Sequence, residues 1–70
     1  MNMQFAIIVS EFNSQITNEL LKGAQTRLQE NGVPDKNIFV CKVPGAVEIP
    51  LVAKLLAKKQ IYQAIICLGA

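Results

Sequence analysis

The sequence predicts an α/β protein with a parallel sheet, because three apolar runs alternate with two segments of helical periodicity along 70 residues. The runs are short, rich in β-branched residues and almost uninterrupted, which is typical of strands buried on both faces of a sheet. Right-handed crossovers would place these strands in the order 2-1-3 with one helix on each face. The expected architecture is therefore a flavodoxin-like three-layer αβα sandwich.

The first strand is expected at residues 5–9, and the first helix from Asn13 or Ser14, either of which can cap it. Asn31-Gly32 followed by Pro34 is a signal for the end of that helix. Apolar residues at four-residue spacing predict the face that packs on the sheet: Ile16, Leu20, Ala24 and Leu28, widened by Leu21.

The second strand is expected at residues 38–43, and Pro44-Gly45 then turns the chain into a helix that begins at about Ala46. Pro50 would lie within the first turn of this helix or just past it, where its missing N–H costs little. The third strand is expected at residues 62–68. The predicted apolar face of the second helix consists of Ile49, Val52, Ala53 and Leu56.

Length and composition indicate a single domain over residues 1–70, shorter than the usual range of roughly 100–150. The hydrophobic fraction of 51% is high for a small domain, and one helix on each face is thin cover for strands this apolar. We therefore expect an incomplete domain whose sheet is covered by further chain or by another subunit.

Charge and cysteine usage narrow the classes of function. The net charge is +2 with scattered lysines, which gives little support to nucleic-acid binding. The apolar runs are far shorter than a membrane span of roughly 20 residues, and residues 1–4 lack the features of a signal peptide. Cys41 and Cys67 have no metal-binding spacing and no histidine to complete a zinc site, so we expect free thiols, no metal and a cytoplasmic protein.

The carboxyl ends of parallel strands meet at one edge of a sheet, where ligands of such proteins bind. The predicted topology brings three segments to that edge: Phe12-Asn13, residues 44–48 and Gly69-Ala70. Phe12 could pack on its own helix as a hydrophobic staple, or it could serve as an aromatic platform for a flat ring. Asn13 could be a plain helix cap or a ligand contact.

The segment after the second strand has two interpretations as well. Glycine at position 45 lets a ligand approach the backbone closely. Glu48 could compensate the helix dipole or accept hydrogen bonds from ligand hydroxyl or amine groups. Gly69 could simply end a strand, or it could leave space for the ligand. The chain has no phosphate-loop motif and no histidine, so its residues can bind a ligand but none is identified for proton transfer.

The three segments together resemble the 6,7-dimethyl-8-ribityllumazine synthase family, over essentially the whole chain. The residues that carry the resemblance are Phe12-Asn13 with Ile16-Thr17, Leu20-Leu21 and Gly23-Ala24, then residues 43–50 (V-P-G-A-V-E-I-P), then Tyr62, Ala64-Ile65-Ile66 and Leu68-Gly69-Ala70. The family condenses 5-amino-6-ribitylaminouracil with 3,4-dihydroxy-2-butanone 4-phosphate, without metal or organic cofactor. The resemblance thus implies an enzyme of riboflavin biosynthesis.

The resemblance also implies roles for individual residues. Phe12 would stack on the pyrimidine ring, Ala46, Val47 and Glu48 would hold the ring edge and the ribityl chain, and Ala70 would begin a third binding segment. Ala46 stands where the family often has serine, and Val47 where it often has an aromatic residue, which makes a smaller wall. Family sites lie between subunits of a pentamer, and some members assemble twelve pentamers into a shell.

In the family, a segment after the third strand supplies the phosphate contacts and the histidine proposed for proton transfer. These features are absent from the 70 residues, so we expect the chain alone to be inactive. Two alternatives stay open: a truncated derivative that binds ribityl-pyrimidines without turnover, and an unrelated flavodoxin-like binding or signalling module. The absence of an acidic cluster after the first strand weakens the second alternative.

Overall fold

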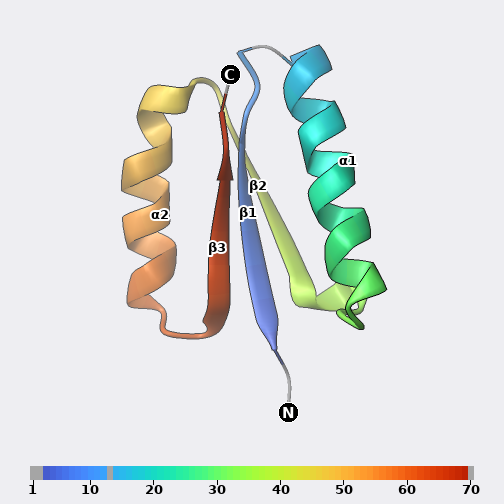
Figure 1. The fold of residues 1–70 in the computed structure, drawn as a ribbon. Coiled ribbons are helices and arrows are strands. Elements are labelled where there is room, and N and C mark those ends of the chain that lie inside the picture. The colour runs from blue at the N-terminus through green and yellow to red at the C-terminus, as the bar shows by residue number, and fades with distance from the viewer. Residues whose placement is uncertain (1–2, 13, 70) are drawn as a thin grey trace.

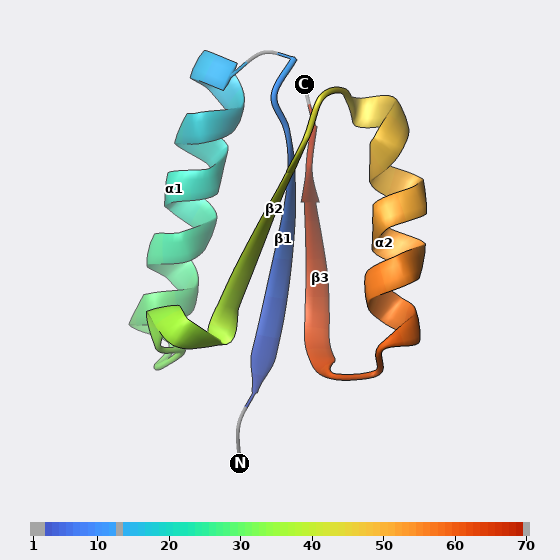
Figure 2. The same cartoon turned by 180° about the vertical axis from the view of Figure 1, so that it is seen from behind.

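The computed structural model describes residues 3–12 and 14–69. Three parallel strands, β1 (Gln4–Ser10), β2 (Ile38–Val43) and β3 (Tyr62–Leu68), form one sheet in the order β2-β1-β3. Helices α1 (Ser14–Glu30) and α2 (Ile49–Lys58) lie on opposite faces of this sheet (Figure 1), as the view from behind in Figure 2 also shows. The predicted fold class, strand order and three layers are therefore confirmed.

The central strand β1 carries the core. Its residues Ala6, Ile7, Ile8 and Val9 are fully buried. Ile7 pairs with Val40 on one side and with Ile66 on the other, so β1 has a neighbour along both edges and a helix on each face. Because both faces and both edges of β1 are covered, its residues are apolar throughout and do not alternate with polar ones.

Helix α2 packs with the face that the sequence predicts. Leu56 is buried with Ala6, Ile8 and Val43 in one cluster, and the other three predicted residues pack against it: Ile49, Val52 and Ala53. The prediction of this face is confirmed.

The predicted face of α1 is wrong at its amino-terminal half. Ile16 and Leu20 are 52% and 45% exposed, whereas Thr17 is fully buried. The residues that turn toward the sheet are Thr17, Leu21, Ala24 and Leu28. A helix has 3.6 residues per turn, so a strict four-residue spacing drifts by about 40° at each step and leaves the packed face. The observed spacing of four, three and four residues follows the helical period.

The end of α1 lies where the sequence predicts it. Gly32 has a φ of 87°, the Gly32 N–H donates to the Gln29 carbonyl over 3.0 Å, and the Val33 N–H donates to the Leu28 carbonyl over 3.0 Å. These two bonds form a Schellman motif, in which the left-handed position favours glycine. Val33 is buried beneath the turn.

Pro50 determines how α2 begins. An α-helix that started at Ala46 would need an N–H on residue 50 to reach the Ala46 carbonyl, and proline has none. The chain instead forms a 3₁₀ turn over Ala46–Glu48, in which the Ile49 N–H reaches the Ala46 carbonyl. The α-helix then starts at Ile49, with Pro50 in its first turn. Helical geometry thus begins at the predicted residue, but α-helical hydrogen bonding begins three residues later.

Candidate functional site

The three predicted loops meet at the carboxyl edge of the sheet. The loops after β1 and β2 are joined by the Glu11 N–H, which donates to the Val43 carbonyl over 2.8 Å. The loops after β2 and β3 touch at Gly69, where a Cβ would lie 3.4 Å from the Cβ of Ala46. In Figure 1 the turn before α2, the end of β3 and the end of β1 lie at the same end of the sheet.

Phe12 lies on the surface of this edge with 78% of its area exposed. Its N–H donates to the Ser10 Oγ over 3.4 Å, and Ser10 itself is fully buried at the end of β1. A staple would be covered by its own helix, so this exposure favours the platform over the staple. The sequence interpretation missed Ser10, although a serine directly after a buried strand is a common way to start a turn.

The loop after β2 is closed by two hydrogen bonds between the same two residues. The Gly45 N–H donates to the Glu48 Oε1 over 2.8 Å, and the Glu48 N–H donates to the Gly45 carbonyl over 3.2 Å. Glu48 is half-buried beneath this turn. The sequence offered two roles for Glu48, compensation of the helix dipole and acceptance of ligand hydrogen bonds. Neither of them includes this bond to the Gly45 N–H.

Between these two residues, the chain presents Ala46 and Val47 to the surface. Ala46 is exposed, and Val47 is 81% exposed. Phe12 and Val47 thus offer uncovered apolar side chains from two adjoining loops. Of the other predicted site residues, Asn13 and Ala70 lie outside the described residues.

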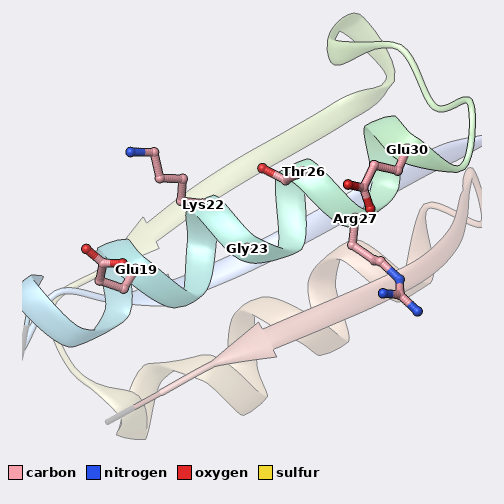
Figure 3. A pocket seen from close by; sticks show the side chains of 6 residues that line it. All are labelled: Glu19, Lys22, Gly23, Thr26, Arg27 and Glu30. Atoms are coloured by element: carbon pink, nitrogen blue, oxygen red, sulfur yellow. The ribbon is translucent and has the colours of Figure 1, made fainter.

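A second surface feature lies away from this edge. A shallow depression of about 400 Å³ lies along α1 and is lined by side chains of that helix alone, with Gly23 between charged neighbours (Figure 3). Within residues 3–12 and 14–69, no group of three histidine, cysteine or acidic side chains could hold a metal ion. No helix of the described part is long and apolar enough to span a membrane. Cys41 and Cys67 are free thiols, as predicted.

The fold and this edge define a parallel α/β protein with a candidate ligand site beyond the carboxyl ends of its strands. Comparison with known families gives the particular one. The sequence model of the 6,7-dimethyl-8-ribityllumazine synthase family matches residues 2–70, and the chain belongs to this family.

Curated relatives agree with this assignment. The chain is 56% identical over 66 residues to a 6,7-dimethyl-8-ribityllumazine synthase from Desulfosudis oleivorans, covering 94% of this chain and 42% of the relative. It is 54% identical over 69 residues to the protein of the same name from Coxiella burnetii, covering 99% and 46%. The Desulfotalea psychrophila protein of that name is 55% identical over 67 residues, covering 96% and 43%. The chain thus spans less than half the length of these relatives.

Proposed function

We propose that these residues belong to an enzyme that condenses 5-amino-6-ribitylaminouracil with 3,4-dihydroxy-2-butanone 4-phosphate to 6,7-dimethyl-8-ribityllumazine in riboflavin biosynthesis. The observation that carries the proposal is the meeting of three loops at one sheet edge, in a chain that belongs to the lumazine synthase family. The matched relatives are named after this activity, and each match covers most of the chain.

The exposed side chains suit the roles that we assign to them. Phe12 offers an uncovered aromatic face for the pyrimidine ring, where stacking is worth about 1–3 kcal/mol. Ala46 and Val47 border the same ligand through their backbone and a small apolar wall. The Glu48 carboxylate accepts hydrogen bonds from the ribityl hydroxyls. Ala70 begins the third binding segment.

We further propose that residues 1–70 alone do not catalyse the condensation. The reaction transfers protons between carbon, nitrogen and oxygen, and a side chain that titrates near neutral pH serves such steps best. These 70 residues include no histidine. The proposed activity therefore needs a residue that this part of the protein does not supply.

The proposal includes a homo-oligomer, a pentamer or an assembly of pentamers, that works in the cytoplasm. Leu51 and Leu55 lie one turn apart on α2 and are exposed, together with Ile61 after the helix. Such apolar area on a small domain is typical of a surface that another element covers. A native mass measurement of the purified protein tests this part, and a monomer would contradict it.

The test of the function is a coupled measurement of binding and turnover on the purified complete protein, with residues 1–70 alone as the control that should form no product. The pyrimidine substrate is titrated first, and the lumazine product is then followed by its absorbance after addition of the butanone phosphate. Binding followed by product formation is the expected result. Binding without product would indicate the non-catalytic derivative, and absence of binding at millimolar pyrimidine would overturn the proposal.

A further inference from the structure

The carboxylate of Glu48 makes a short hydrogen bond inside its own loop. Its Oε1 lies 2.8 Å from the Gly45 nitrogen, and the return bond from the Glu48 N–H to the Gly45 carbonyl measures 3.2 Å. A hydrogen bond between an ionised carboxylate and an N–H is roughly twice as strong as one between neutral groups. The two bonds close a ring around Ala46 and Val47, whose side chains are exposed.

The Oε1 bond acts on Gly45 at the start of the turn, whereas the bond from the Ile49 N–H to the Ala46 carbonyl holds the other end of the turn. Gly45 is extended, with φ −148° and ψ 165°, and no side chain of its own restrains it. Val47 is 81% exposed and therefore contributes little packing. The bond to Oε1 thus restrains Gly45, the residue with which the turn begins.

We propose that Glu48 is a positioning residue that holds the Gly45–Val47 backbone in its binding conformation through Oε1, and meets the ligand through Oε2. This inference rests on the proposed function. It assigns the two oxygens of one carboxylate to two roles: Oε1 holds the loop, and Oε2 binds the ligand. A ligand that uses the ring-binding backbone would depend on Glu48 even when that ligand has no hydroxyl chain. A carboxylate that only accepted ribityl hydroxyls would be irrelevant to such a ligand.

Two variants separate the tasks in the complete protein. In Glu48→Gln the amide oxygen can still accept the Gly45 N–H, so the loop is kept while the charge facing the ligand is lost. In Glu48→Ala both are lost. The probes are 5-amino-6-ribitylaminouracil and 5,6-diaminouracil, which keeps the ring and lacks the polyol chain, and each is titrated to a dissociation constant with every variant.

For the ring-only probe, we expect Glu48→Ala to weaken binding about tenfold, the effect of one charge-assisted hydrogen bond, and Glu48→Gln, which keeps a neutral bond of about half that strength, to weaken it only about threefold. For the ribityl ligand, both variants should weaken binding. If Glu48→Ala leaves the dissociation constant of the ring-only probe unchanged, the positioning role is overturned. A parent protein that binds neither probe would instead contradict the proposed function.

Amide hydrogen exchange provides a second readout that needs no ligand. The Gly45 amide should be protected in the parent and in Glu48→Gln, and should exchange at least about tenfold faster in Glu48→Ala. The Val33 amide, bonded at the far end of the molecule, serves as the internal control for global unfolding. Equal exchange of Gly45 in all three proteins would contradict the inference even if every variant folds.

Discussion

Replacement of Phe12 by alanine tests whether this side chain binds the ligand or packs against the protein. Phe12 is 78% exposed, so only about a fifth of its surface is covered. An aromatic side chain buries about 150–250 Å² when fully covered, and the covered fifth therefore contributes about 1 kcal/mol to stability at most. Loss of ring stacking should instead weaken pyrimidine binding by about 1–3 kcal/mol, or about 5- to 150-fold.

Phe39 is the matched control. It is 47% exposed and stacks on Tyr62 with ring centroids 6.4 Å apart. It pairs with Ala6 near the amino end of the sheet, away from the candidate site. About half of its surface is covered, so Phe39→Ala should lower the free energy of unfolding by about 2–4 kcal/mol, including the aromatic pair. The pyrimidine affinity of the folded variant should not change.

The assay measures two quantities for each variant in the complete protein: the dissociation constant for the pyrimidine, and the midpoint of thermal or denaturant unfolding. The expected pattern is a crossed one, in which Phe12→Ala changes affinity and Phe39→Ala changes stability. If Phe12→Ala binds as tightly as the parent, or if it loses as much stability as Phe39→Ala, the platform interpretation is refuted and Phe12 is a structural residue.

Three further predictions concern the turns and the thiols. Gly32→Ala should destabilise the protein by about 1 kcal/mol, because the φ of 87° strains a residue with a Cβ, and a midpoint equal to the parent would contradict this. Gln60→Gly should have the opposite sign and stabilise by up to about 1 kcal/mol, since Gln60 has a φ of 55° after α2; a lower midpoint would refute it. Cys67, which is exposed, should react with a thiol reagent before the half-buried Cys41, as peptide mass mapping over time can show. Preferential labelling of Cys41 would contradict the burial of the two side chains.

The strands could be predicted closely because each is a short and nearly continuous apolar run, which indicates a strand before its residues are assigned to one face or the other. Only β1 proves to be buried on both faces. The helix α1 was harder, because the residues on its packed face depend on the angle at which the chain leaves β1. Thr17 takes a fully buried place there while the more apolar Ile16 stays exposed, and hydrophobicity alone cannot predict that exchange. The convergence of the three loops followed from topology, whereas the bond from Gly45 to Glu48 depends on a side-chain rotamer that sequence spacing does not specify.

The site is restrained on two scales, which predicts how it tolerates change. Within each loop, the bonds from Phe12 to Ser10 and from Gly45 to Glu48 span at most three residues, so local sequence sets the shape of each loop. Between the loops, spacing is set by the sheet, in which Val9 pairs with both Lys42 and Leu68. A change within a loop should therefore alter one class of ligand contact, as the Glu48 variants test. A change in strand register would separate Phe12 from residues 45–48 and remove all contacts together, because a slip by one residue turns every side chain of a strand to the opposite face.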